Sequence, residues 1–152
     1  MKQIRIKVNK IIERFLVLIL VGMVLNVIWQ VFTRFFTSSP SAFTNELARY
    51  LMIWLGILGA AYISGKQEHV AIDFFVKKLN NSLRRFIDRF VLFSILSFAF
   101  FVMIIGGINL VYITLKLEQY SPSLQIPLAL VYSIIPISGL LIIFYKVTQE
   151  KS

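Results

Sequence analysis

Two ionisable side chains, Glu46 and Arg49, are the strongest candidates for chemistry in this chain, because a long apolar stretch begins beside them. Charged groups in apolar surroundings are costly and are therefore candidates for function. A spacing of three places both side chains on one face of a helix, within reach of each other. They either contact a solute or a coupling ion, or form a structural ion pair that orients the helix or bonds another subunit. We expect the structural pair.

A second group of candidate ligands surrounds the only histidine, His69, which lies with Glu68 and Asp73 in a short polar stretch. One imidazole and two carboxylates on a short loop make a poor metal site. A single histidine excludes a haem held by two, and the absence of cysteine excludes thiolate chemistry. The chain also lacks a glycine-rich phosphate loop and a nucleophile elbow. We therefore expect no enzyme activity, no cofactor and no metal, and a loop-anchoring hydrogen bond for His69.

Four long apolar stretches must position these residues. They cover residues 15–33, 47–64, 90–115 and 128–145, and each approaches the ~20 residues with which a helix crosses a ~30 Å hydrocarbon layer. Hydrophobic residues make up 58% of the chain, charged residues make up 15%, and the mean hydropathy is +0.79. A soluble domain of this size could not hide four such stretches from water. We predict an all-α membrane protein, a single domain of four transmembrane helices packed as one compact bundle over residues 1–152.

The basic residues between these stretches alternate in number. Five lie in residues 1–14, six in residues 66–89 and two in the C-terminal tail, whereas the other two connections hold only Arg34 and Lys116. The positive-inside rule therefore predicts that both termini and the middle loop are cytoplasmic. Because topology accounts for the net charge of +9, we expect no nucleic-acid partner. Residues 15–33 exceed the apolar core of a signal peptide and lack a following cleavage pattern, so we expect a retained helix.

Polar and small residues within the first two stretches predict where helices contact each other. One stripe of the first helix has spacings of four, four and three, and its polar side chains require a protein partner in lipid, in this chain or in another subunit. Two small residues four apart in the second helix also allow close approach. The stripe holds Gly22, Asn26, Gln30 and Thr33, and the small pair is Gly56 and Ala60.

The middle loop is the longest polar segment. From Phe75 to Phe90, apolar residues recur at helical spacing, and lysine and arginine fill much of the remainder. A basic helix with an apolar stripe lies at the lipid surface, with its cations near anionic head groups. We predict an interfacial amphipathic helix on the cytoplasmic side, with a bend near residues 80–82 into the third span. A solvated linker is the alternative.

Three segments together resemble the small membrane subunit of the tripartite ATP-independent periplasmic (TRAP) transporters. The second span resembles the family's acidic-x-x-Arg start, its tryptophan and its Gly-Ala run, and a His-hydrophobic-x-hydrophobic-Asp signature follows. The last outer loop and helix are also similar. The chain departs from the family at Phe43 and Asn45, where the family often has tryptophan and a second acid. The matching residues are Glu46 to Tyr50, Trp54, Leu55-Gly56, Gly59 to Ala61, His69 to Asp73, Ser121 to Pro127, Tyr132, Pro136 and Gly139.

The resemblance implies a role. In this family a large many-helix subunit performs sodium-coupled elevator transport of organic anions such as carboxylates or acidic sugars, after a periplasmic solute-binding protein has captured the solute. The small subunit is a fixed scaffold in the inner membrane of a bacterium or archaeon, and it helps to dock the soluble protein. The implied partners are therefore the large subunit, the solute-binding protein and membrane lipids. The candidate contact residues are Asn26, Gln30, Glu46, Arg49, Trp54, Gly56, Ala60, His69 and Asp73.

The alternative function is a stand-alone four-helix exporter of small solutes or drugs. Such an exporter needs a titratable carboxylate in the middle of the membrane, and none of the four stretches contains one. Members with dual topology also need nearly balanced basic loops, whereas this chain is strongly biased. Transport by the purified chain alone would favour the exporter, and co-purification with a much larger membrane protein would favour the scaffold.

Overall fold

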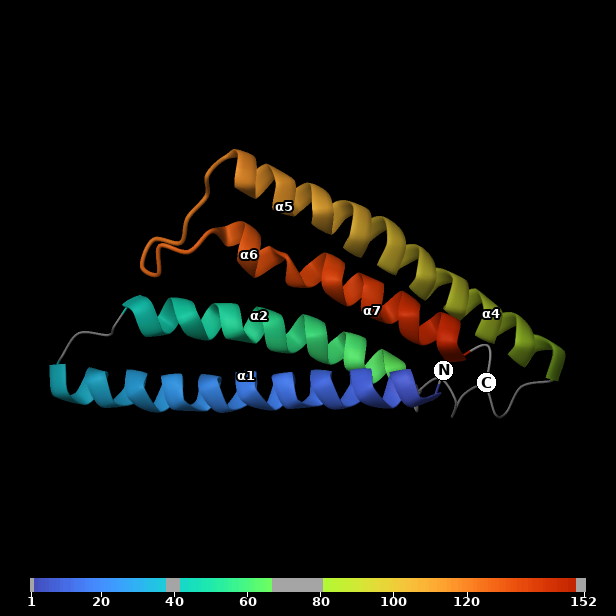
Figure 1. Cartoon of the computed structure of the whole chain (residues 1–152), viewed down its shortest axis with the longest axis horizontal. Helices are drawn as coiled ribbons and strands as arrows, with labels where there is room; N and C mark the ends of the chain where they lie inside the picture. The colour runs from blue at the N-terminus through green and yellow to red at the C-terminus, as the bar shows by residue number, and fades with distance from the viewer. Residues whose placement is uncertain (1, 38–41, 67–80, 150–152) are drawn as a thin grey trace.

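The computed structural model describes residues 2–37, 42–66 and 81–149, and these residues form four helical rods (Figure 1). All four are long and apolar enough to cross a membrane, which confirms the predicted fold class. The first two rods are single helices, the third contains a central π-helix, η1, and the fourth is divided in two. In chain order the elements are α1 (Lys2–Thr37), α2 (Ala42–Gly65), α4 (Asn81–Ser97), η1 (Phe98–Gly106), α5 (Gly107–Lys116), α6 (Leu128–Tyr132) and α7 (Ile134–Gln149).

The rods extend beyond the apolar stretches that reveal them. Helix α1 has 36 residues, or about 54 Å at ~1.5 Å per residue, against a hydrocarbon layer of ~30 Å. The basic residues before Phe15 therefore belong to the same helix as the first span. Backbone hydrogen bonds allow a helix to continue from the lipid into water. Hydropathy therefore locates only the part of the helix that lipid surrounds, and not the ends of the helix.

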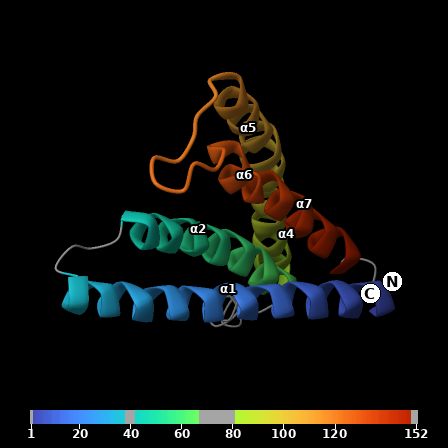
Figure 2. The same cartoon turned by 60° about the vertical axis from the view of Figure 1, so that its left-hand side comes forward.

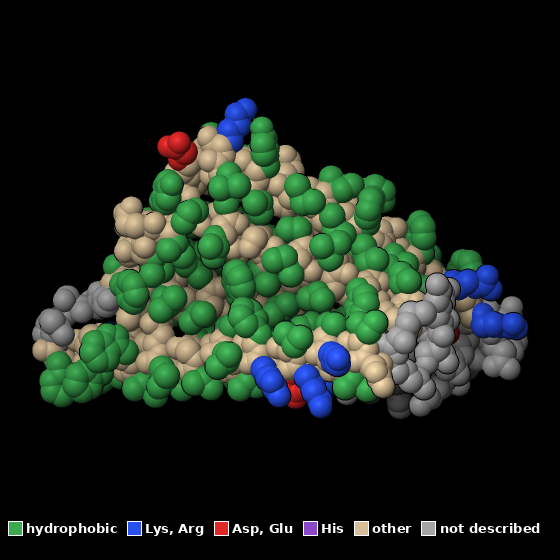
Figure 3. Space-filling model, viewed as in Figure 1, with side chains coloured by type: hydrophobic (Ala, Val, Ile, Leu, Met, Phe, Trp, Pro, Cys, Tyr) green, Lys and Arg blue, Asp and Glu red, His purple; other side chains and the backbone are tan. Residues whose placement is uncertain are grey.

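The four rods form an open row rather than the compact bundle that the sequence predicted. Helix α1 packs on α2, α2 on α7, and α7 on η1. These contacts place α2 and α7 inside the row, and of the four rods the fourth is the most deeply buried. Lipid solvates apolar side chains, so nothing drives such a row to close. Hydrophobic side chains consequently cover the face shown in Figure 3.

Two small clusters of buried residues hold the row together. In the first cluster, Ile12 of α1 and Leu58 of α2 meet Ile134 and Tyr145 of α7. The second cluster joins α2, η1 and α7 through Ala61, Ala99 and Ile142. Figure 2 shows the third rod steeply inclined to α1, so the row fans out from these contacts.

Glycines permit the closest helix approaches, but not the glycines that the sequence indicated. A Cβ added at Gly139 would lie 2.9 Å from the Cβ of Met103, and one added at Gly107 would lie 2.9 Å from the Cδ of Pro136. At Gly56, which is exposed, an added Cβ would meet nothing within 4 Å. The small pair that Gly56 forms with Ala60 is therefore on an open face of this chain.

The fourth rod is interrupted at Ser133, between α6 and α7. Pro136 has no backbone N–H, and its ring excludes the carbonyl of Tyr132 one turn earlier, which interrupts the helix at this point. Trp54 of α2 donates its indole N–H to the carbonyl of Val131 at 3.0 Å. Because the last carbonyls of a helix lack partners within it, this bond satisfies one end of α6. The Trp54 indole thus has its partner inside the chain.

Both ends of the described chain lie at one end of the row, together with the end of α2 and the start of α4 (Figure 1). This arrangement agrees with the alternation of basic residues, although the assignment of that end to the cytoplasm stays a prediction. Residues 81–89 continue directly into the third span as the first part of α4. The predicted interfacial helix lies outside the described residues up to residue 80, and Asn81 and Ser82, at the predicted bend near residues 80–82, already belong to α4.

Candidate functional site

Within the described ranges, the polar group with the most hydrogen bonds to other residues is the carboxylate of Glu46, in the first turns of α2 at the end of the row opposite the termini. One oxygen accepts hydrogen bonds from the backbone N–H groups of Ser123 at 2.8 Å and of Leu124 at 3.2 Å. The other oxygen accepts a hydrogen bond from the Tyr50 hydroxyl, 2.8 Å away. Glu46 therefore ties the start of α2 to the outer loop, which we define as residues 117–127 between α5 and α6.

The outer loop has a defined fold of its own. Tyr120 and Pro127 form an antiparallel bridge. The backbone N–H and the backbone carbonyl of the buried Ser121 both form hydrogen bonds with other backbone groups of the loop. Glu118 and Gln125 have φ angles of 48° and 55°, in the left-handed region that residues other than glycine rarely adopt. Such unfavourable angles persist where contacts with the surroundings hold the backbone in place. The bonds to Glu46 supply contacts of this kind from outside the loop.

The predicted ion pair between Glu46 and Arg49 is not formed. Arg49 is exposed and has no ion pair within the part of the chain that the structure describes. It lies on the exposed side of α2 with Met52 and Gly56, whereas the Glu46 carboxylate is directed at the outer loop. A shared helix face permits pairing, but two backbone N–H groups and a hydroxyl hold the carboxylate instead. Arg49 stays a candidate for contact with a partner.

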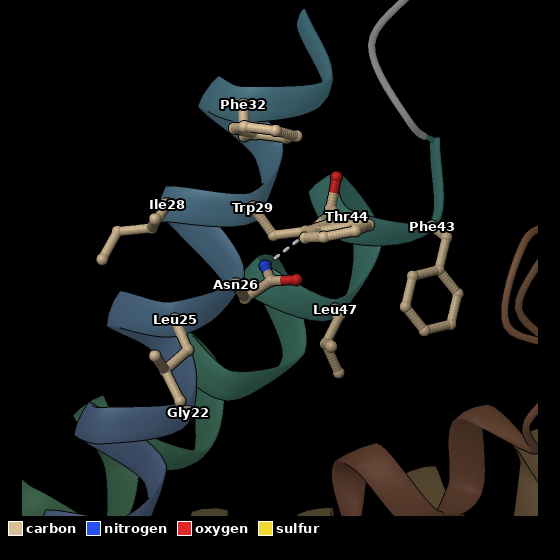
Figure 4. Close-up of a pocket in the computed structure, with 9 residues that line it drawn as sticks. All are labelled: Gly22, Leu25, Asn26, Ile28, Trp29, Phe32, Phe43, Thr44 and Leu47. Carbon is tan, nitrogen blue, oxygen red and sulfur yellow. Dashed lines mark hydrogen bonds between the residues drawn. The ribbon is translucent and has the colours of Figure 1, made fainter. Parts of the chain in front are cut away.

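Among the described residues, the polar stripe of α1 has one hydrogen-bond partner on another helix. Asn26 donates its side-chain N–H to the backbone carbonyl of Thr44 at 2.7 Å, and both residues are buried (Figure 4). This bond lies in an apolar groove of about 620 Å³ between α1 and α2, which Gly22 also lines. Farther along the stripe, Thr33 donates to the backbone carbonyl of Gln30 within α1. Helix α2 of the same chain is thus the partner of Asn26.

Replacing Asn26 with leucine removes this bond and leaves the carbonyl of Thr44 in the groove without it. A hydrogen bond between membrane helices contributes roughly 0.6–2 kcal/mol, so we expect a loss of stability of that size. The midpoint of unfolding in a sodium dodecyl sulfate titration measures it. Gln30→Leu is the matched control, because the Gln30 side chain has no hydrogen bond in the described structure. Equal midpoints for the two variants would contradict the assigned role of Asn26.

The remaining predicted residues cannot all be placed. His69 and Asp73 lie outside the described residues, as does Glu68, so their anchoring role stays a prediction. In the ranges that the structure does describe, no three histidine or acidic side chains gather as metal ligands. The sequence did not reveal the backbone N–H groups of Ser123 and Leu124 as partners of Glu46. The Ser-Pro-Ser turn was the available signal, but it lies more than 70 residues from Glu46.

Comparisons with known proteins confirm the resemblance that the motifs indicate. Residues 23–149 match the family described as "Tripartite ATP-independent periplasmic transporters, DctQ component". Over 142 residues (93% of this chain and 86% of the relative), the chain is 28% identical to a TRAP transporter small permease protein of Haemophilus influenzae. It is 35% identical over 102 residues (66% of this chain and 44% of the relative) to the C4-dicarboxylate TRAP transporter small permease protein DctQ of Rhodobacter capsulatus.

A third relative is a different kind of chain. The sialic acid TRAP transporter permease protein SiaT of Haemophilus influenzae is 37% identical over 62 residues, which are 41% of this chain but only 10% of the relative. The family match covers most of the chain and all four rods in whole or in part. The chain therefore belongs to the DctQ component of the TRAP transporters, as a small permease subunit that spans the bacterial inner membrane several times.

Proposed function

We propose that this small permease subunit is the non-catalytic scaffold of a sodium-coupled transporter that takes up organic anions. It supports the large permease subunit in the membrane and helps to dock the periplasmic solute-binding protein. The open row of helices carries this proposal, because a row with broad exposed apolar faces provides a surface for a larger membrane partner. A closed four-helix bundle would bury those faces in its own core.

The distribution of charge supports a scaffold rather than a carrier. No Asp, Glu, Lys, Arg or His occurs in residues 15–33, 50–65, 90–115 or 119–145, so ionisable side chains are confined to the ends of the rods. A carrier that couples solute movement to an ion usually places polar or charged groups near the middle of the membrane. The groups that bind the solute and the coupling ion are therefore expected in another subunit.

The relatives support both the partner and the class of solute. SiaT contains a stretch similar to this chain inside a permease chain that is much longer, so a small-subunit sequence occurs together with a large permease in one polypeptide. The names of the relatives specify sialic acid and C4-dicarboxylates, which are organic anions. We infer that the large permease is a separate partner here and that the solute is an organic anion.

The outer loop supports the docking role. The loop lies at the end of the row opposite both termini (Figure 1). Because the positive-inside rule places the termini in the cytoplasm, it places this loop in the periplasm. Several of its side chains, including Tyr120 and Gln125, are exposed although the loop backbone is held in place. A rigid loop with exposed side chains binds a soluble partner without a large ordering cost.

Reconstitution tests the proposal. The chain, the large permease and the solute-binding protein are combined in liposomes with a sodium gradient, and uptake of a labelled dicarboxylate or sialic acid is measured. We expect uptake only when all three proteins are present, and co-purification of the chain with the large permease. Undiminished uptake without this chain would contradict the scaffold role. Transport by this chain alone would instead identify the stand-alone exporter.

A further inference from the structure

A cavity with two cationic side chains in its lining lies at the end of the row that holds the start of α1, far from the outer loop. Its volume is about 360 Å³, and it is lined by Arg5, Ile6 and Asn9 of α1 and by Gly65 and Lys66 at the end of α2. The first turns of α1 and the last turn of α2 therefore form its walls. None of the predicted family motifs falls on these residues.

Hydrogen bonds fix the polar groups of this cavity in place. The Arg5 guanidinium donates to the backbone carbonyl of Gly65, and the Asn9 side-chain oxygen accepts a hydrogen bond from the Tyr145 hydroxyl at 2.6 Å. The latter bond occupies the acceptor of Asn9 and leaves its two amide N–H groups as donors. A guanidinium has five N–H donors, and here only one of its nitrogens donates to the Gly65 carbonyl. The polar groups in the cavity lining are therefore mainly hydrogen-bond donors.

The net charge of the cavity is positive. Arg5 and Lys66 each bring a full charge, and no acidic side chain lines the cavity among the described residues. The C-terminal end of α2 opposes them with only about half a negative charge, which the Arg5 guanidinium contacts directly. Donors around two cations suit a phosphate group, because guanidinium binds phosphate oxygens in pairs and an ammonium binds them as a point charge.

The apolar part of the lining indicates which kind of phosphate compound the cavity binds. Ile6 lines it and is more than half exposed, and most of the surface that lines the cavity is apolar. A free phosphate ion would gain nothing from this apolar surface, whereas the acyl chains of a phospholipid would cover it. We propose that this cavity is a binding site for the phosphate group of an anionic phospholipid. The lipid anchors the beginning of α1 to the end of α2 at the membrane surface.

Native mass spectrometry of the full-length purified chain tests the site, with phosphatidylglycerol added to the delipidated protein. The double variant R5Q/K66Q removes both cations of the cavity. The double variant K7Q/K10Q is the matched control, because it removes the same charge from exposed positions of α1 outside the cavity. We expect one tightly bound phosphatidylglycerol for the wild type and the control, and binding at least about tenfold weaker for R5Q/K66Q, since charge-assisted hydrogen bonds are lost.

Two further arms make the result decisive. Lys66→Gln alone keeps the bonds of Arg5 and Asn9 and loses the contact of the Lys66 ammonium with the Tyr62 ring, 4.7 Å from the ring centroid. It should weaken phosphatidylglycerol binding strongly with at most a small fall in the unfolding midpoint, because an exposed cation–π contact contributes only about 0.5–1 kcal/mol; this difference separates lost binding from lost folding. Excess inorganic phosphate is added in competition, and we expect no displacement of the lipid. Displacement by inorganic phosphate would overturn the phospholipid assignment. Equal lipid binding by R5Q/K66Q and K7Q/K10Q would overturn the site itself.

Discussion

Replacing Glu46 with alanine is expected to weaken docking of the solute-binding protein by about tenfold while the subunit stays folded and membrane-inserted. The carboxylate holds the N–H groups of Ser123 and Leu124 and the Tyr50 hydroxyl. Without it, the outer loop loses its two backbone hydrogen bonds to α2 and must be ordered again whenever the partner binds. Binding of the solute-binding protein to the reconstituted complex, measured by surface plasmon resonance or microscale thermophoresis, gives the dissociation constant.

Two other variants make the Glu46 experiment specific. Glu118→Gln removes a carboxylate from the outer loop that has no hydrogen bond or ion pair in the described structure, so it should leave docking nearly unchanged. Glu46→Gln keeps a carbonyl acceptor but loses the charge and the second acceptor oxygen, so docking should be intermediate. If Glu46→Ala and Glu118→Gln bind the soluble partner equally well, the loop contact has no part in docking.

Replacing Gly139 with alanine is expected to destabilise the contact between η1 and α7. Its Cβ would lie 2.9 Å from the Cβ of Met103 and 3.1 Å from the backbone oxygen of Ala99. Neither atom is the tip of a flexible side chain, so the two rods must move apart. Overpacking of this kind costs roughly 1–3 kcal/mol. The unfolding midpoint in a sodium dodecyl sulfate titration measures the loss.

Gly56→Ala is the matched control for Gly139→Ala. Gly56 is also helical, but an added Cβ there meets nothing within 4 Å. Alanine is the better helix former by about 0.5–1 kcal/mol, so this variant should be as stable as the wild type or slightly more stable. A Gly139 variant with the stability of the Gly56 variant would show that the contact between η1 and α7 tolerates a wider spacing.

The open row leaves Gly56, Ala60 and Arg49 on a side of α2 that the chain itself does not cover. These residues were predicted to contact a partner, and that prediction stands. Asn26 and Trp54 were predicted in the same group, but their hydrogen bonds end on Thr44 and Val131 of the same chain. The structure therefore separates residues whose hydrogen bonds lie within the subunit from residues that stay exposed on its surface.

The sequence alone determined that this protein is a four-helix membrane subunit of the TRAP family. Span length and apolar composition are local properties, and lipid permits only a few structures for such segments. The helix break before Pro136 was likewise predictable, because a missing N–H acts within one turn. The ends of the rods were not, because polar residues at a membrane surface continue a helix without an apolar signal, as the first turns of α1 do.

Only the tertiary structure decided which side chains meet. Glu46 shares a helix face with Arg49 but bonds an outer loop more than 70 residues away, and periodicity cannot reveal such a partner. Gly139 packs tightly whereas Gly56 does not, although both are small residues in apolar helices. Lipid is as apolar as the side chains that it surrounds, so hydrophobicity does not mark the faces that pack. Close fit and individual hydrogen bonds choose those faces, and both depend on residues from separate helices.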